Sequence, residues 1–281
     1  MGRPIVVAVE DYGVAHGVCD AALDLVAMGR VSAIAARPRG AAFATRAGEL
    51  ADLPRGIATG LALDLANGRP ARFLANALAG RLDRDALVAA ITAEIDLFAQ
   101  SVGRTPDFLG APGELHVAPG VRAALLLALD VYGLAGRTWL RDPSERLSAR
   151  VRRGLASLRA GSASALATGF ASAARRRGYV TNEGYAGFLP GTRDLAIPTA
   201  YERLAQAPGR APLLVTRPAY PDATLEALDR LSERRGRELF YLSSTRFADL
   251  MEILDWRLVP APGLTPSAAR PPGASSPPPA P

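Results

Sequence analysis

Histidine and cysteine are scarce in this chain of 281 residues, which has two histidines and a single cysteine. One cysteine cannot form an internal disulfide, and it excludes a zinc site built from several cysteines. With one cysteine and only His16 and His116, any hypothesis of a metal or nucleophile site has few residues to draw on. Cys19 follows His16 by three residues, a spacing compatible with a nucleophilic pair. Because Cys19 opens an alanine-rich segment, we instead expect a buried, apolar thiol.

Long apolar runs are missing as well. The best candidate for a membrane span, residues 123–131, is far shorter than the roughly 18 to 20 residues that cross a bilayer. The apolar stretch at residues 5–9 ends at Glu10 and Asp11, so it is too short for a signal peptide. We therefore expect a cytoplasmic protein. Its content of 49% hydrophobic and 21% charged residues is typical of a globular chain with one large α/β domain or two small ones.

Lysine is absent, so all 33 basic residues are arginines, and with 27 acidic residues the formal net charge is +6. The excess lies in residues 144–177, which hold eight arginines and one acidic residue, Glu145. The stretch from Arg146 to Arg177, named here the arginine-rich segment, could attract phosphate, RNA or an anionic membrane surface. A solvated helical face is the simpler interpretation. Phe170 is the only aromatic residue of the segment, which argues against base stacking.

Short apolar runs alternate with segments of helical periodicity along the chain. Repeated strand–helix units predict a parallel sheet with covering helices, and their number favours an irregular or seven-stranded (β/α) barrel over an open sheet. Asp83 is a candidate N-cap of a long helix. The predicted strands are residues 5–9, 31–36, 57–65, 107–109, 213–216 and 253–259, and the predicted helices are residues 18–28, 41–50, 83–102, 120–131, 222–234 and 244–250.

The composition changes from Pro260 onward, where nine of the last 22 residues are proline. Such a segment cannot form a core, so we expect a disordered tail. The sequence therefore divides into a barrel domain, residues 1–259, and a tail, residues 260–281.

Polar residues follow several predicted strands, at the positions where βα barrels carry their chemistry. The first strand runs into Glu10 and Asp11. One of these carboxylates could bind a metal while its neighbour acts as a general base, or both could form an acidic turn before a helix. The fourth strand is followed by Glu114 and His116, and the strand at residues 213–216 by Arg217.

These segments resemble the YdjC-like carbohydrate deacetylases, a family that includes chitooligosaccharide deacetylases and hopanoid-associated deacetylase-like proteins. The similarity covers residues 5 to about 259 and implies a deacetylase barrel. It is carried by five motifs in the same order and spacing. Residues 10–13 resemble the family's Asp-Asp-Phe-Gly, and residues 60–63 with 68–70 resemble its Gly-Leu-His-Leu with Gly-Arg-Pro. Residues 108–121 align with its histidine-rich loop. Residues 217–220 resemble its His-Pro-Gly-Tyr, and residues 234–243 its Arg-x-x-Glu-Leu-x-x-Leu-x-Ser.

The resemblance implies roles for individual residues. Asp11 would hold a divalent cation, often Mg²⁺, and Glu10 would activate the water that attacks the acetamide of an N-acetylated sugar. Tyr12, Arg217 and Tyr220 would contact the ligand. Most other family ligands are replaced. Ala62 and Arg217 stand at histidine positions, and Phe108, Gly110, Pro112 and Glu114 stand where the family has His, Asp, His and His, which leaves His116 at the last histidine of that run.

Two interpretations of the site remain open at this point. In one, Asp11, Glu114 and His116 form a rebuilt metal site, and the chain is an active metal-dependent deacetylase or amide hydrolase. In the other, Arg217 pairs with Glu10, Asp11 or Glu114 across the barrel mouth, and a metal-free pocket binds a small sugar-like or anionic ligand with weak or no hydrolysis. We favour the second. A homodimer is compatible with both.

Overall fold

A ten-residue strand, β1 (Arg3–Tyr12), occupies the middle of the sheet, and eight of its residues are buried. The computed structural model describes residues 2–153, 158–187, 196–206 and 208–264. Within that part β1 pairs in parallel with β2 (Ala33–Ala36), β8 (Leu213–Thr216) and β9 (Trp256–Leu258). The sequence of a strand that is buried on both faces is a continuous apolar run, which is the pattern at residues 5–9.

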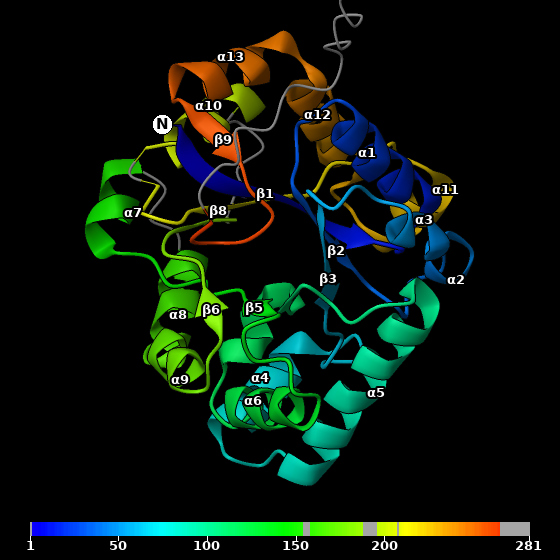
Figure 1. Ribbon diagram of the computed structural model, residues 1–281, viewed down its shortest axis with the longest axis vertical. Coiled ribbons are helices and arrows are strands. Elements are labelled where there is room, and N and C mark those ends of the chain that lie inside the picture. Colours follow the sequence, from blue (N-terminus) through cyan, green and yellow to red (C-terminus); the bar gives the residue numbers. More distant parts are fainter. Residues whose placement is uncertain (1, 154–157, 188–195, 207, 265–281) are drawn as a thin grey trace, which may run out of the picture.

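The remaining strands continue the curl of the sheet on both sides of β1 (Figure 1). Along the main path the order is β6-β5-β4-β3-β2-β1-β8-β7, and neighbouring strands on it are parallel. The strands not yet named are β3 (Ala58–Ala62), β4 (Phe108–Gly110), β5 (Trp139–Leu140), β6 (Val180–Thr181) and β7 (Tyr185–Ala186). The predicted irregular parallel barrel is confirmed.

The two ends of this path, β6 and β7, are separated by only residues 182–184 in the sequence. The chain therefore crosses the open edge of the barrel in one short step, and an antiparallel bridge joins Glu183 to Ala211 there. We call this region the seam.

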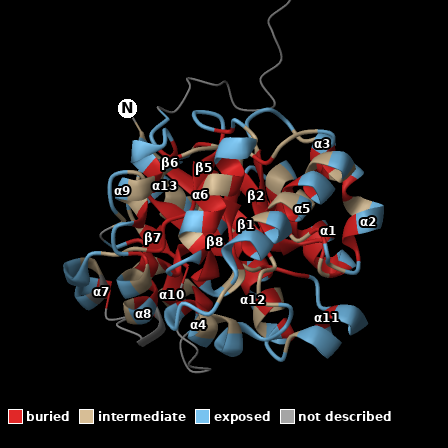
Figure 2. Ribbon diagram, turned by 90° about the horizontal axis from the view of Figure 1, so that it is seen from below, coloured by how far each residue is buried: buried red, intermediate tan, exposed pale blue. Residues whose placement is uncertain are grey.

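Helices cover the outer side of the sheet (Figure 1), and buried residues gather in the strands and on the helix sides that face them (Figure 2). A 3₁₀ segment, η1 (Pro112–Val117), follows β4. The helices are α1 (His16–Ala27), α2 (Phe43–Arg46), α3 (Gly48–Ala51), α4 (Pro70–Leu78), α5 (Arg84–Val102), α6 (Val121–Val131), α7 (Leu147–Arg153), α8 (Leu158–Leu166), α9 (Phe170–Arg176), α10 (Ile197–Leu204), α11 (Ala223–Leu228), α12 (Ser232–Ser243) and α13 (Thr245–Ile253).

The barrel interior is filled by a second, smaller apolar cluster. Small side chains from β1, β2 and β3 face two aromatic rings from β4 and β5, Phe108 and Trp139, which stack with centroids 4.5 Å apart. Gly60 of β3 makes room for this stack, because a Cβ atom there would lie 2.4 Å from the Phe108 ring. The interior is therefore a packed core below the mouth, as in other βα barrels.

Several predicted elements differ from the observed ones. The helix predicted at residues 41–50 consists of two four-residue helices, α2 and α3, and the one at 222–234 ends at Leu228 before α12 begins at Ser232. The last strand begins at Trp256 instead of Ile253, because α13 continues through that residue. Strands β5, β6 and β7 were not predicted, since two residues cannot show a period.

The predicted tail begins inside the packed region. The carbonyl of Pro260 accepts a hydrogen bond from Nε1 of Trp139 at 3.3 Å, and Ala261 packs against the interior cluster. The ordered contacts of the barrel thus extend beyond residue 259. Residues 265–281 lie outside the described residues. Across the described residues, no helix combines the length and apolar character needed to cross a membrane.

The N-cap predicted at Asp83 is present, since its Oδ1 accepts hydrogen bonds from the backbone N–H groups of Asp85 and Ala86. We expect Asp83→Ala to lower the free energy of unfolding by about 1 kcal/mol, because two N–H groups at the helix start lose their partner. Urea denaturation measures the change. Asp83→Ser, which can still cap, should stay close to the parent, and equal losses in both variants would contradict a capping role.

Candidate functional site

The two carboxylates that end β1 both belong to the barrel mouth. In a regular strand, neighbouring side chains point to opposite faces. Here Asp11 has a φ of +67°, and the pairing register between β1 and β2 shifts between Val9 and Tyr12. Aspartate is one of the few residues that adopt this left-handed conformation readily. The irregularity breaks the alternation, so that Glu10 and Asp11 can each meet an arginine.

Glu10 lies between two guanidinium groups. Its Oε1 accepts a hydrogen bond from Nη1 of Arg141, which follows β5, and its Oε2 lies 2.5 Å from Nη2 of Arg217, which follows β8. The pair of Arg217 with Glu10 is one of the three that the sequence predicted. Only 4% of the Glu10 side chain is exposed. Both carboxylate oxygens are therefore engaged away from bulk water.

Arg141 connects Glu10 to a second carboxylate. Its Nε lies 3.0 Å from Oε2 of Glu114, and its Nη2 donates to the carbonyl of Ala111. Gly110 allows this passage, because a Cβ atom there would lie 2.6 Å from the Arg141 Nε. Burial lowers the pKa of Arg141 to about 10, which still leaves the guanidinium charged at neutral pH. Arg141 thus supplies a permanent positive charge at the centre of the mouth.

Asp11 is held by two other arginines. Nη2 of Arg235, from α12, lies 2.9 Å from Oδ2, and Nη1 of Arg37, directly after β2, lies 3.8 Å from Oδ1. Burial raises the pKa of Asp11, but the attraction of Arg235, helped by Arg217 and Arg37, outweighs it and holds the pKa below its usual value. Asp11 is therefore an ionised carboxylate inside a shell of arginines.

His116 is fully buried, and both of its ring nitrogens bind the backbone. Nδ1 accepts a hydrogen bond from the N–H of Ala111 at 3.1 Å, which places the ring proton on Nε2, 2.7 Å from the carbonyl of Arg141. Burial lowers the pKa of His116 to about 4. A neutral imidazole bonded in this way has no lone pair left for a metal. His116 instead fixes the segments that carry Glu114 and Arg141.

These residues do not fit the divalent cation that the family resemblance implies. The lone pair a metal would need on His116 is occupied, and Glu114 is bound by Tyr185, whose hydroxyl donates to Oε1 at 2.8 Å. Within the part of the chain that the structure describes, His, Cys, Asp and Glu residues form no group of three or more that could hold a metal ion. Asp11, Glu114 and His116 are therefore not brought together as ligands, and guanidinium groups occupy the region between the carboxylates.

The other candidate residues lie outside the mouth. Tyr12 is buried, and its hydroxyl donates to the carbonyl of Arg46 and to Glu49, so the proposed contact of Tyr12 with a ligand is not supported. Tyr220 is half-exposed and donates to Asp24 of α1, 2.8 Å away. His16 is exposed at the start of α1, and Cys19 is buried as expected. Burial raises the pKa of the Cys19 thiol to about 11, which suppresses the nucleophilic thiolate.

Three arginines of the mouth were missed at the sequence level. Arg37 directly follows a predicted strand, so the rule of polar residues at strand ends could have found it. Arg141 follows the two-residue strand β5, which carries no periodic signal. Arg235 lies inside a helix, and it reaches Asp11 only because α12 packs against this end of the barrel.

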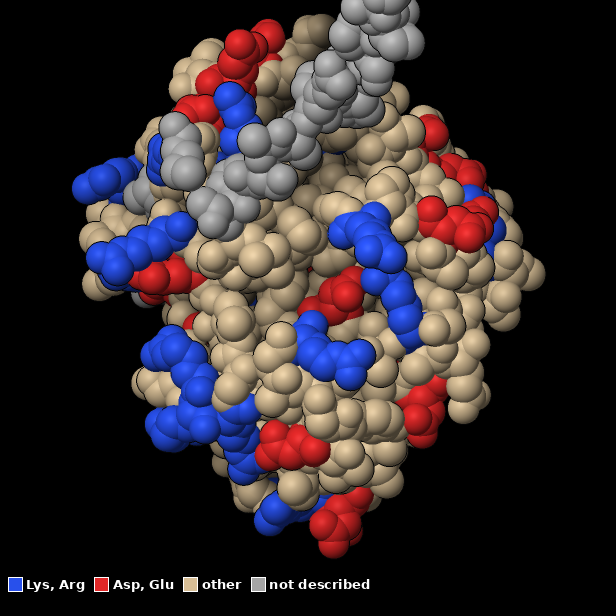
Figure 3. All heavy atoms as spheres, viewed as in Figure 1, with Lys and Arg blue, Asp and Glu red and all other residues tan. Residues whose placement is uncertain are grey.

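The cluster presents its positive members to solvent. The side chains of Arg37 and Arg217 are 26% and 33% exposed, whereas those of Glu10 and Asp11 are 4% and 10% exposed. The face drawn in Figure 3 has acidic atoms recessed near its centre, with basic side chains on either side. Asp64 pairs with Arg37 at 2.8 Å, and its side chain is as exposed as that of Arg37. An incoming ligand would therefore meet this pair and Arg217 before it meets Glu10 or Asp11.

Comparison with known proteins agrees with this barrel. The sequence profile of the YdjC-like proteins matches residues 4–252. The chain belongs to the YdjC-like protein family. A human carbohydrate deacetylase is 28% identical over 188 residues, which cover 54% of this chain and 58% of that protein, so the chain matches somewhat over half of this relative's length.

Two solved structures show the fold of this YdjC-like chain. A proposed cellobiose-phosphate cleavage protein of Enterococcus faecalis superposes with a TM-score of 0.66 at 15% identity, covering 92% of this chain and 97% of the other. The catalytic domain of a peptidoglycan N-acetylglucosamine deacetylase of Eubacterium rectale gives 0.50 at 8% identity, with 96% and 94% covered. The family is thus carbohydrate deacetylase-like, with the same curled parallel sheet.

We expect Arg141→Met to lower the free energy of unfolding by about 3 to 5 kcal/mol, because it leaves Glu10 and Glu114 buried without their shared cation. Urea denaturation at neutral pH measures this loss. Arg217→Met should cost clearly less, since Arg217 is partly solvated. Combining Arg141→Met with Glu10→Gln should recover part of the stability. A double variant no more stable than Arg141→Met alone would contradict the coupling.

His116 makes stability depend on pH in a defined window. Its pKa is about 4 in the folded chain and about 6.5 when unfolded, so the unfolded chain binds more protons between these values. The stabilisation is complete above pH 6.5 and is lost as the pH falls toward 4, by about 3 kcal/mol. Unfolding free energies measured across this range should rise with pH in the parent and rise less steeply in His116→Asn. If the unfolding free energies of the parent and of His116→Asn changed in parallel with pH, His116 would not be the source of the pH dependence.

Proposed function

We propose that this YdjC-like chain binds a small anionic, sugar-like ligand at the barrel mouth through Arg37 and Arg217, and that its hydrolase activity is weak or lost. The observation that carries the proposal is the clamping of both carboxylates of the first strand, Glu10 and Asp11, by guanidinium groups. In the resemblance these two carboxylates are the general base and the metal ligand.

Neither ancestral role fits the contacts of these carboxylates. A general base needs a lone pair directed at a water molecule, but both oxygens of Glu10 already accept guanidinium protons in a site closed to solvent. A metal site needs further neutral nitrogen or carboxylate ligands beside Asp11, but the side chains that contact Asp11 are those of Arg37 and Arg235. A divalent cation placed there would be repelled by nearby positive charges.

The same arginines suit a carboxylate or phosphate group. A guanidinium donates several hydrogen bonds in a planar fork that matches either anion. Arg37 and Arg217 keep part of their surface in contact with water. Membership in a carbohydrate deacetylase-like family supports a sugar as the body of the ligand. A sugar acid combines both features.

Titration calorimetry tests this with glucuronate, glucose and Mg²⁺ as separate titrants. We expect glucuronate to bind more tightly than glucose, Arg217→Gln to weaken glucuronate about tenfold through loss of a charge-assisted hydrogen bond, and Mg²⁺ to show no stoichiometric binding. Arg246→Gln is the matched control, because Arg246 lies on the distant α13, is exposed and pairs with Glu202 of α10.

Release of acetate from N-acetylglucosamine oligomers provides the opposing outcome. Acetate release that requires added divalent cation and is abolished by Asp11→Asn would show that the ancestral reaction persists and would contradict the proposal. Equal affinity for glucose and glucuronate would contradict the role of the arginines.

A further inference from the structure

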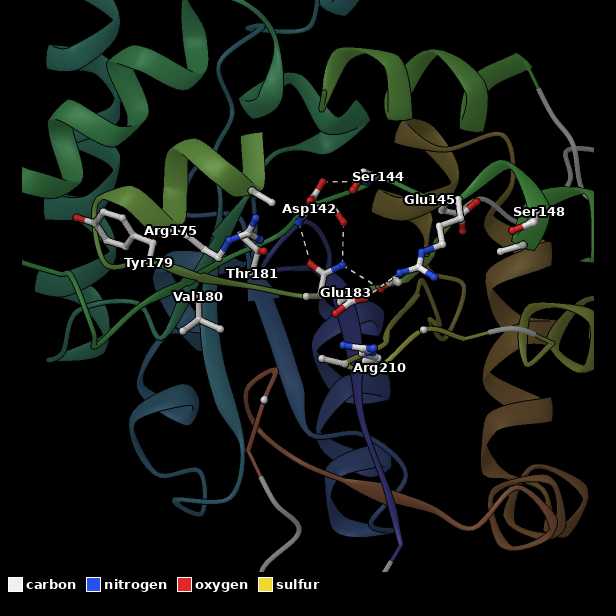
Figure 4. A pocket seen from close by; sticks show the side chains of 18 of the residues that line it. Asp142, Ser144, Glu145, Ser148, Arg175, Tyr179, Val180, Thr181, Glu183 and Arg210 are labelled. Atoms are coloured by element: carbon white, nitrogen blue, oxygen red, sulfur yellow. Dashed lines mark hydrogen bonds and ion pairs between the residues drawn. The ribbon is translucent and has the colours of Figure 1, made fainter. Parts of the chain in front are cut away.

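A cavity of about 1040 Å³ opens at the seam of the barrel, apart from the residues of the mouth. It is lined by residues of α7 and α9, by β6 with the residues on either side of it (178–184), and by residues 209–211 (Figure 4). Glu10, Asp11 and Arg217 are not among its walls. The two residues that directly follow β5 separate the two sites, because Arg141 contacts Glu10 of the mouth and Asp142 lines the cavity.

The floor of the seam cavity is held together by hydrogen bonds, and its acidic groups already have partners. Asn182 accepts from the N–H of Asp142 at 2.8 Å and donates to the carbonyls of Asp142 and Gly184, which ties the crossing chain to the end of β5. Asp142 in turn accepts from the N–H of Ser144, and Glu145 forms a buried ion pair with Arg153 at 2.5 Å. The floor therefore offers a preformed polar surface with little free negative charge.

The rim is strongly positive. Four exposed arginines line it, whereas Glu183 is its only exposed acidic residue and already pairs with Arg146 at 3.3 Å. In the described part of the chain, no carboxylate pairs with Arg152 or Arg210. In Figure 4 Arg175 runs toward Thr181, and Arg210 lies next to Glu183, while Figure 3 shows basic side chains gathered over α8 and α9. The rim arginines are Arg146, Arg152, Arg175 and Arg210.

The geometry points to a binding site for a small phosphorylated, hydroxyl-rich ligand, with a sugar phosphate as the chemical class. Guanidinium forks bind phosphate, and the hydroxyl groups of Ser144, Ser148 and Thr181 can exchange hydrogen bonds with sugar hydroxyls. A concave cavity of this size suits a small molecule better than a flat bilayer surface.

A nucleotide is less suited to the seam cavity than a sugar phosphate. Tyr179 is the aromatic residue of the lining, and it is 1% exposed with its hydroxyl bound to Asp130. A base would therefore find no free ring on which to stack. The arginine-rich segment has few acidic residues nearby in the sequence to balance its charge. It supplies three of the four rim arginines of the seam cavity, Arg146, Arg152 and Arg175.

Titration calorimetry with glucose 6-phosphate, and with glucose and inorganic phosphate as comparisons, tests the site in the full chain. We expect saturable binding of glucose 6-phosphate at the seam cavity, measured as one molecule per chain in the Arg217→Gln background, that weakens about tenfold when Arg210→Gln or Arg152→Gln is added. Arg176→Gln is the matched control, because Arg176 is an exposed arginine adjacent to Arg175 that does not line the cavity. Thermal melts of these surface variants should match the parent.

The outcomes separate this site from the mouth. Glucose 6-phosphate binding that survives Arg217→Gln supports the seam cavity whether or not the mouth binds glucuronate. Loss of that binding in Arg217→Gln alone, an equal loss in Arg176→Gln and Arg210→Gln, or no saturable binding at millimolar concentrations would each overturn the inference. Binding to anionic lipid vesicles that Arg210→Gln weakens and glucose 6-phosphate does not displace would assign these arginines to a membrane surface instead, and would overturn it too.

Discussion

The Glu10 carboxylate, held between the guanidinium groups of Arg141 and Arg217, is the interaction on which the mouth of this barrel depends. It joins the ends of three strands, β1, β5 and β8, that are far apart in the sequence. Through Arg141 it also reaches Glu114, and through the carbonyl of Arg141 it reaches the buried ring of His116. Charge, strand ends and the loop after β4 are therefore organised around one carboxylate.

A buried ion-pair network of this kind is weak evidence for net stabilisation. Buried ions lose their hydration, and their mutual attraction restores that free energy only where geometry and additional hydrogen bonds are good. Here Glu10 pairs with two arginines, Glu114 pairs with Arg141 and accepts a hydrogen bond from Tyr185, and Arg141 also donates to a backbone carbonyl. Removing one partner is expected to lower the free energy of unfolding by far more than a single intact pair contributes to it, because the other charge stays buried and unpaired. The arginines that pair with the buried carboxylates of the mouth are thus expected to be necessary to the folded chain.

The sequence was informative wherever a strand was long enough to show its pattern. Residues 5–9 predicted β1, and the strand-end rule then placed Glu10, Asp11 and Arg217 at one mouth, which the ion pair of Arg217 with Glu10 confirms. The same reasoning could not find Arg141, because the two residues of β5 have no detectable period. It could not find Arg235 either, since a helical arginine reaches the mouth only through the packing of α12. Local pattern predicted the longer strands but not β5, β6 or β7, and the contacts of Arg141 and Arg235 depend on tertiary structure.

The glycines at positions 60 and 110 restrict the evolutionary paths open to this chain. Gly60 accommodates the stacked ring of Phe108, and Gly110 accommodates the Arg141 side chain. By resemblance, Phe108 and Gly110 occupy positions where relatives carry a histidine and an aspartate. An aspartate at 110 would collide with Arg141, and a histidine at 108 would give up the stack with Trp139. The histidine and aspartate of the relatives could therefore be introduced at positions 108 and 110 only together with changes at Trp139 and Arg141, so these four positions are expected to vary jointly.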